Sequence, residues 1–246
     1  MKARTEALLR LFAVQASYTY ERMLGIGVGH ASAPLLRDVL SARSARAKHE
    51  AVARSADFFN SHPYLAGVAV GAEVRAEQEG ASGAVITRLR RALSGPLGSL
   101  GDQLVWAGWV PALIGIGLVA SSWIGPWSIL IVLVMHNVLR YRVMSWGLDL
   151  GLREGLAVGG ALHRSWLPRA AEDAQRVAAF AIGMAVPIVA WQVLAAAPHG
   201  DAGIAILLGV LGIVLTVWSP TRTRVTGLRY GLVLLGAGLL VVWGIR

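Results

Sequence analysis

The sequence predicts an all-α integral membrane protein, in which an N-terminal amphipathic and re-entrant helical region precedes about five transmembrane helices. Two properties lead to this prediction. Hydrophobic residues make up 55% of the 246 residues and charged residues only 15%, whereas a soluble domain usually carries about 25% charged residues. The hydrophobic residues are also concentrated in uncharged stretches whose length suits a lipid bilayer.

Five uncharged stretches account for the predicted transmembrane helices. They are Leu104–Ser122, Trp123–Leu139, Val177–Ala197, Gly203–Trp218 and Tyr230–Ile245. A helix needs about 20 apolar residues to cross the hydrocarbon core. Buried helices of a soluble protein are the alternative, but such helices keep a polar face, and Ile204–Val217 has only Thr216 to supply one.

The composition also limits the chemistry of the chain. There is no cysteine, so disulfides, thiolate metal sites and cysteine nucleophiles are excluded. The net charge is +9, which in a soluble protein would suggest a nucleic-acid partner. Here the basic residues precede or separate the apolar stretches, so anionic lipid and membrane orientation explain them better. We therefore expect a lipid bilayer and no nucleic acid.

Residues 1–57 are predicted to form a helical region on the cytoplasmic side of the membrane. Apolar residues recur there at helical spacing, namely Leu8, Leu11, Phe12 and Ala16. This spacing indicates an amphipathic helix. The small-residue run Gly25–Gly29 permits close backbone packing, and Ser41–Asp57 is typical of an exposed helix rich in alanine and arginine.

Residues 58–103 are predicted to form a re-entrant region, and residues 104–246 the transmembrane region. Tyr64–Ala72 is apolar but too short to cross a bilayer as a helix, so it is either core or re-entrant. Gly95–Asp102 is rich in glycine and proline, and we expect it to break the chain before the first full span.

The distribution of arginine predicts a membrane topology. The Arg140–Arg176 connection contains six arginines and Pro220–Arg229 contains three, whereas Ser121–Ser122 and Pro198–Ala202 contain neither lysine nor arginine. The positive-inside rule places the arginine-rich connections in the cytoplasm. Five crossings then leave the C-terminus outside.

The densest group of polar and aromatic side chains is Asp57–Tyr64. Asn60 can donate and accept hydrogen bonds, His62 can do either, and Tyr64 adds a hydroxyl on an aromatic ring. Pro63 ends the preceding helix and favours an extended conformation at His62. This mixture suits a sugar ring, and the alternative is a helix end followed by a turn.

Asp102 follows Gly101 at the start of an apolar stretch. The residue could cap a helix by accepting hydrogen bonds from its first free N–H groups. A carboxylate close to the membrane is also a functional candidate, and the two roles are compatible. The sequence has no HExxH, GxSxG or Walker A pattern, so we expect the chain not to be an enzyme on its own, and we expect no cofactor and no metal.

Four ordered motifs resemble the IID subunits of the mannose/fructose/sorbose phosphotransferase family. The first comprises Phe12, Gln15, Ser17, Glu21, Arg22, Met23 and Gly27. The second comprises Phe58, Phe59, Asn60, His62, Pro63 and Tyr64, with Ser61 in place of threonine. The third comprises Leu93, Gly95, Pro96, Leu97, Gly101, Asp102 and Trp106, with Arg90 in place of lysine. The fourth comprises Asn137, Arg140 and Gly147.

The resemblance implies a multi-pass subunit of the bacterial inner membrane. In the family, IID pairs with a IIC membrane subunit to bind and translocate a hexose-type sugar. IIA and IIB proteins relay phosphate from phosphoenolpyruvate to that sugar. The predicted substrate-binding residues are Asn60, His62, Asp102, Gln15 and Glu21. A IID-like scaffold or regulator of a reduced phosphotransferase system without sugar transport is the alternative, and an unrelated membrane enzyme is a third possibility.

Overall fold

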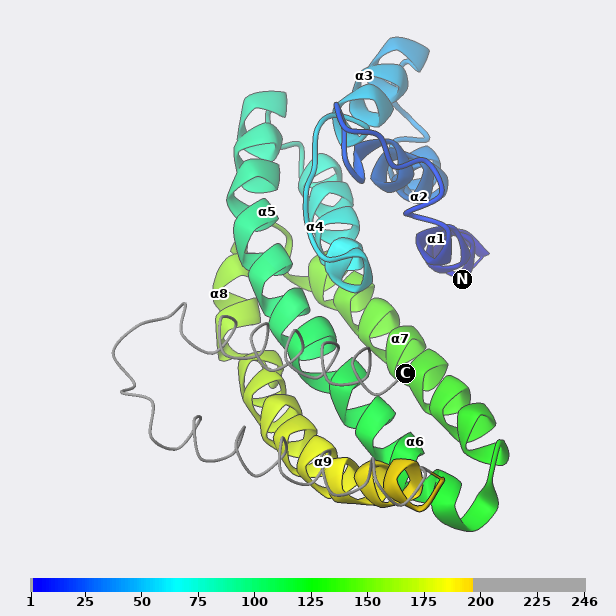
Figure 1. Ribbon diagram of the computed structural model, residues 1–246. Coiled ribbons are helices and arrows are strands. Elements are labelled where there is room, and N and C mark those ends of the chain that lie inside the picture. Colours follow the sequence, from blue (N-terminus) through cyan, green and yellow to red (C-terminus); the bar gives the residue numbers. More distant parts are fainter. Residues whose placement is uncertain (1, 197–246) are drawn as a thin grey trace. The chain divides into compact units, whose positions relative to one another are not determined.

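The computed structural model describes residues 2–196, and every regular element in that range is a helix (Figure 1). The α-helices are α1 (Lys2–Phe12), α2 (Gly25–Val39), α3 (Ala45–Ser55), α4 (Ala66–Gln78), α5 (Gly83–Leu104), α6 (Val110–Ile124), α7 (Trp127–Glu154), α8 (Val158–Arg164) and α9 (Leu167–Ala196). Three short elements join them: the 3-10 turns η1 (Pro63–Leu65) and η3 (Gly155–Ala157), and the π-helical turn η2 (Val105–Trp109). The all-α prediction is confirmed for this part of the chain.

The described residues fall into two units. The first ends at Ala185, and of the second, which begins at Val186, only the last turns of α9 are described. The predicted stretches Gly203–Trp218 and Tyr230–Ile245 lie outside the described residues. The connections Pro198–Ala202 and Pro220–Arg229, with their predicted sides of the membrane, also lie entirely outside them.

The N-terminal helices pack into the core of the first unit. In α1 the predicted apolar face is present in part: Leu8 and Leu11 are buried, but the helix ends at Phe12, and Ala16 is exposed in the turns that follow. The small residues of α2 allow other backbone segments to come close: a Cβ on Gly27 would lie 2.1 Å from the Val14 carbonyl oxygen. Helix α3 begins where the Ser44 hydroxyl accepts a hydrogen bond from the Ala47 N–H, and it is largely exposed or half-buried, with only Ala51 and Ser55 buried.

Helices α4 and α7 cross at four glycines. A Cβ on Gly71 would lie 2.4 Å from the Leu148 carbonyl oxygen, and a Cβ on Gly151 would lie 2.3 Å from the Val68 carbonyl oxygen. Gly67 and Gly147, one turn earlier on each helix, also face the partner helix. Glycine at every fourth position lets two helix backbones touch. The apolar stretch Tyr64–Ala72 is consequently buried in the core of this unit.

The predicted break at Gly95–Asp102 is wrong, because α5 runs through it without interruption (Figure 1). Proline normally disfavours helical geometry in the preceding residue through a clash with its Cβ. Gly95 has no Cβ, so this clash is relieved. The stripe formed by Leu93, Leu97, Gly101 and Leu104 is buried, and its burial outweighs the low helix propensity of glycine and proline.

The helix changes pitch directly after α5. The Val110 N–H donates to the Val105 carbonyl oxygen five residues back, which makes η2 a single π-helical turn. Pro111 follows and has no N–H to donate to the preceding turn. Such turns recur at functional sites. Trp106 lies within this one.

Two helical stretches of the described residues, Gly83–Ile124 and Trp127–Val189, are long and apolar enough to cross a membrane, and the second includes α7, α8 and α9. Only 33% and 17% of their most apolar windows are buried inside the protein, so their apolar side chains largely face outward, as lipid-exposed residues do. The predicted boundary between the first two spans, at Ser121–Ser122, lies slightly too early, because the chain turns at Gly125, which has a φ of 57°, and at Pro126.

Candidate functional site

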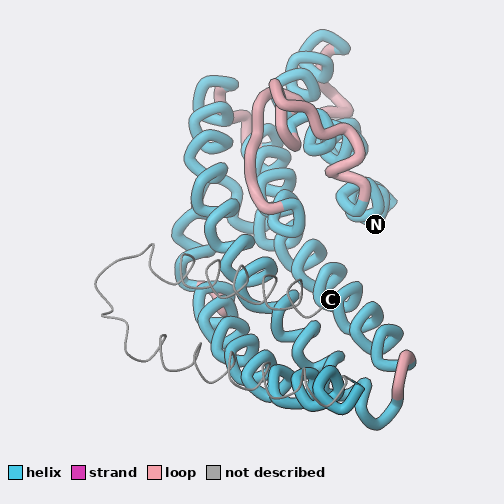
Figure 2. Tube along the Cα trace, viewed as in Figure 1, coloured by secondary structure: helices cyan, strands magenta, loops and turns pink. Residues whose placement is uncertain are grey.

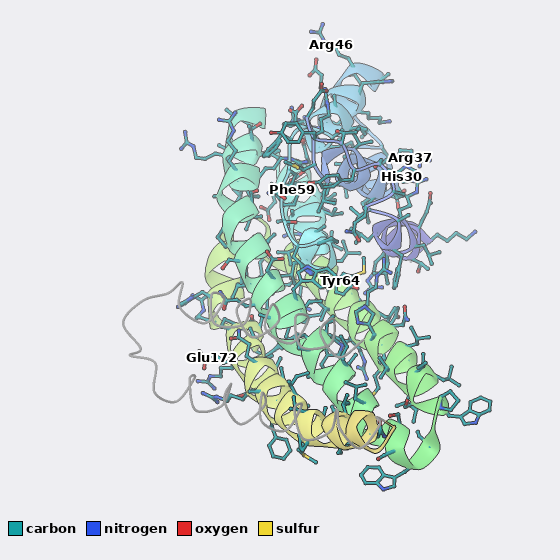
Figure 3. All side chains as sticks on the ribbon, in the orientation of Figure 1. His30, Arg37, Arg46, Phe59, Tyr64 and Glu172 are labelled. Carbon is teal, nitrogen blue, oxygen red and sulfur yellow. The ribbon has the colours of Figure 1, made fainter. Side chains whose placement is uncertain are left out.

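Residues 57–62 of the motif form the irregular connection between α3 and η1, drawn as a loop in Figure 2, and Pro63 and Tyr64 begin η1. Its backbone pairs with the α1–α2 loop: the Phe59 N–H donates to the Arg22 carbonyl oxygen, and the Leu24 N–H donates to the Phe59 carbonyl oxygen. Phe59 is buried and anchors the segment, whereas Asn60 is exposed. Figure 3 labels Phe59 and Tyr64 near the two ends of the motif.

His62 is extended, as the following proline predicts, and it caps η1. Its Nδ1 accepts a hydrogen bond of 3.2 Å from the Tyr64 N–H. The neutral ring therefore carries its proton on Nε2. His62 is 2% exposed, and this buried Nε2 has no hydrogen-bond partner among residues 2–196. A buried donor without a partner is costly, so the alternative of a simple turn leaves this nitrogen unexplained.

The protonation state of His62 follows from its surroundings. Burial lowers the pKa of His62 to about 4, and the nearby carboxylate of Asp102 opposes that shift. Protonation would also place a hydrogen on Nδ1 against the Tyr64 N–H. His62 is therefore a neutral donor near pH 7 and is suited to bonding with an uncharged hydroxyl.

Helix α5 supplies the opposite side of the site. A Cβ on Gly101 would lie 2.1 Å from the His62 Cβ, so the absence of a side chain there brings the motif against the helix. Asp102 and Trp106 are exposed, one turn apart on the same helical path. The Trp106 ring centroid lies 5.8 Å from that of His62. Asp102 lies inside α5, so its predicted role as a helix N-cap is wrong.

Tyr64 links the motif to α7. Its ring packs edge-on against His62 with centroids 4.9 Å apart, and its hydroxyl shares a hydrogen bond of 2.8 Å with His136 Nε2. The Arg140 guanidinium lies 5.4 Å above the Tyr64 ring and donates to the Phe12 carbonyl oxygen. The motif is thus in contact with both α5 and α7.

The five predicted site residues do not all meet. Asn60, His62 and Asp102 gather around the second half of α5: the Ser94 hydroxyl donates to the Asn60 carbonyl oxygen, and Asp102 acts electrostatically on His62. Gln15 and Glu21 are exposed in the α1–α2 loop. That loop pairs with Phe59, but neither side chain has a described contact with the other three residues.

A buried ion pair beside the motif was missed by the sequence reasoning. Arg90 Nη1 donates to Glu73 Oε1 at 2.6 Å, and each side chain is 3% exposed. Burial raises the pKa of Glu73, and the Arg90 guanidinium opposes that shift. Trp106 was also not predicted as a site residue. One signal was available for each: Glu73 follows an apolar run directly, and Trp106 lies four residues after Asp102.

The sequence model of one protein family, described as the PTS system mannose/fructose/sorbose family IID component, matches residues 1–232 of this chain. The chain belongs to this family. The resemblance predicted from the four motifs is therefore confirmed. Both the family and the two long apolar helical stretches identify this IID protein as a membrane protein.

Several curated IID proteins are similar to this chain. It is 28% identical to the mannose-specific EIID component of Escherichia coli K12 over 186 residues, which cover 72% of this chain and 64% of that protein. It is 29% identical to the sorbose-specific EIID component of Lacticaseibacillus casei over 180 residues, which cover 70% and 62%. This IID chain thus spans less than two thirds of the length of these relatives.

Two solved structures share its fold. A chain described as a membrane protein aligns with a TM-score of 0.62 and 25% identity, over 74% of this chain and 68% of that chain. A chain in the cryo-EM structure of the mannose transporter ManYZ with microcin E492 aligns with a TM-score of 0.53 and 20% identity, over 100% and 96%. The second likeness concerns the fold alone.

Proposed function

We propose that this chain is the IID membrane subunit of a phosphoenolpyruvate-dependent permease that binds and translocates a hexose-type sugar together with a IIC subunit. The sugar would be phosphorylated by a partner IIB protein, which receives its phosphate from IIA. The chain itself would carry no catalytic residue. Family membership supports this proposal.

The observation that carries the sugar site is the buried Nε2–H of His62, which has no hydrogen-bond partner in the part of the chain that the structure describes. A sugar hydroxyl oxygen is an uncharged acceptor that suits it. The surrounding groups match the rest of a sugar ring: Asn60 and Asp102 can bond further hydroxyls, and the Trp106 ring can cover a C–H face. Gln15 and Glu21 remain proposed binding residues at the edge of the same region.

A IIC partner is supported by the first half of α7. Leu133, Val134, Asn137, Val138 and Tyr141 line a hollow of about 430 Å³ on its exposed side. The Asn137 amide donates to the Leu133 carbonyl oxygen within this apolar surface. An amide within a spanning helix tends to face protein rather than lipid. We propose that a IIC helix covers this hollow, which makes the protein a hetero-oligomer.

The membrane placement is also a proposal. We propose a multi-pass protein of the bacterial inner membrane with about five spans, with residues 1–57 on the cytoplasmic side, residues 58–103 re-entrant and residues 104–246 transmembrane. The basic Arg140–Arg176 connection would face the cytoplasm. Reporter fusions after Thr221 and after His199 would test this topology, and a cytoplasmic signal at His199 would contradict it.

The direct test is sugar binding by the purified complex with a IIC subunit. Losing a hydrogen bond to a buried hydroxyl costs about 1–3 kcal/mol, or roughly 5- to 150-fold in affinity. We expect Asn60→Ala and His62→Ala each to weaken hexose binding by that order while the complex still assembles, as checked by size-exclusion chromatography. If both variants bind like the parent, the motif is only a turn. If the parent complex assembles without binding any hexose, the scaffold alternative is favoured.

A further inference from the structure

The Arg90 side chain contacts four residues, one on α4 and three in the segment before Asn60. In addition to the Glu73 ion pair, its Nη2 donates to the Asp57 carbonyl oxygen at 2.7 Å and its Nε to the Phe58 carbonyl oxygen at 3.4 Å. The guanidinium also lies 4.8 Å above the Phe59 ring. The planar fork of arginine makes such divided bonding possible, whereas lysine presents a single point charge.

These bonds complete the hydrogen bonding of an irregular segment. Residues 57–60 belong to no helix, so their carbonyl groups need partners from elsewhere. Arg90 bonds the carbonyl oxygens of Asp57 and Phe58, the Leu24 N–H bonds that of Phe59, and the Ser94 hydroxyl bonds that of Asn60. Two side chains, one turn apart on α5, therefore bond three of the four carbonyl groups that precede Ser61.

Stability alone explains the buried pair poorly. Desolvation of two charges offsets most of their attraction, and apolar pairs of similar size often replace buried ion pairs without loss. An apolar side chain at position 90 could not, however, bond the two carbonyl groups.

We propose that Arg90, oriented by Glu73, is a positioning residue that holds the backbone of residues 57–60 so that Asn60 and His62 face the substrate. Its effect on sugar binding rests on the proposed function. Its effect on the segment itself does not, and the two are measured separately.

The decisive variant is the double substitution Glu73→Met and Arg90→Met, compared with Arg91→Met. Arg91 is the exposed neighbour and makes no ion pair among the described residues. Amide hydrogen exchange of peptides covering residues 57–62 reports on the segment without any sugar. We expect the double variant to unfold near the parent's temperature, while exchange in residues 57–62 becomes at least about tenfold faster and hexose affinity falls about tenfold. Arg91→Met should change none of these.

Two further variants keep the proposal testable if the double variant does not fold. Arg90→Lys keeps the ion pair but cannot bond both carbonyl groups, so exchange should be accelerated to an intermediate degree. Ser94→Ala removes one donor and should accelerate exchange in this segment only. If a folded double variant keeps the parent's exchange rates in residues 57–62, Arg90 is merely structural and the proposal is wrong. Unchanged exchange in both Arg90→Lys and Ser94→Ala would overturn it equally. Accelerated exchange in a complex whose parent binds no hexose would support the positioning role and count against the proposed function instead.

Discussion

Gly101 and His62 approach so closely that any side chain at position 101 would occupy the space of the imidazole. A Cβ built on Gly101 would lie 2.1 Å from the His62 Cβ and 2.5 Å from its Cγ. The Cβ cannot move away without a movement of the backbone of the motif. Gly98, three residues earlier on α5, has its nearest neighbour at 3.9 Å, the Ser61 Cα. The two glycines therefore differ in what they permit, although both lie inside one helix.

Gly101→Ala should displace His62 and weaken hexose binding by tenfold or more. It should also lower the free energy of unfolding by about 1–3 kcal/mol, the usual cost of overpacking. Gly98→Ala is the matched control, and it should leave binding unchanged and stabilise the helix by up to about 1 kcal/mol. Thermal unfolding and binding of both variants check this. Equal effects of the two substitutions would show that the close approach has no consequence for the site.

Asp102→Ala should separate binding from folding. Loss of a helix N-cap would cost about 1 kcal/mol, but Asp102 is exposed inside α5 and caps nothing. We therefore expect a change in the free energy of unfolding within about 0.5 kcal/mol, together with hexose affinity lowered roughly 5- to 150-fold. Denaturant titration and binding by the assembled complex measure the two quantities. A clear loss of stability with unchanged binding would argue that the carboxylate is structural.

His62 should make the protein less stable as the pH falls below about 6.5. The unfolded chain takes up a proton on this histidine near pH 6.5, whereas burial lowers the folded pKa to about 4 despite the nearby carboxylate of Asp102. Between these values the unfolded state binds more protons, so stability rises with pH and is lost as the pH falls through the window. The slope contributed by one group is at most about 1.4 kcal/mol per pH unit.

The matched variant for this prediction is His62→Asn. Its amide oxygen can accept the Tyr64 N–H but does not titrate. Unfolding of parent and variant at pH 7 and pH 5 should show a larger loss for the parent. The same pH dependence in both proteins would mean that His62 is not desolvated in solution.

Gly151→Ala should disrupt the crossing of α4 and α7. The added Cβ would meet the Val68 carbonyl oxygen at 2.3 Å and the Ala72 nitrogen at 2.6 Å. Both are backbone atoms in a helix, so the helices must separate, at a cost of about 1–3 kcal/mol or more. At Gly159 in α8, an added Cβ would meet no atom of the other described elements within 4 Å, so Gly159→Ala should be neutral or stabilising. Expression level and thermal unfolding of the two variants provide the measurement.

Local features of the fold could be predicted because they depend on neighbours along the chain. The three uncharged stretches that lie within the described residues correspond to α6, the first half of α7 and the apolar part of α9. The extended conformation of His62 follows from Pro63 alone. The family was also recognisable, since its motifs are ordered strings of residues. In contrast, the roles of Gln15 and Glu21 stay predictions, because no described contact tests them.

Other features depended on residues far apart in the sequence. Gly95-Pro96 reads locally as a break, yet α5 continues because burial of Leu93 and Leu97 outweighs local propensity.

The sequence by itself determined a helical membrane protein of the IID family with an Asn60–His62 motif. Only the tertiary structure decided which groups bond that motif. Arg90 lies 33 residues from Asp57 and bonds its backbone carbonyl oxygen, a group whose partner the side-chain types do not reveal. Hydrophobicity and backbone preference are properties of short segments, whereas a hydrogen-bond partner is chosen by the packing of the whole unit.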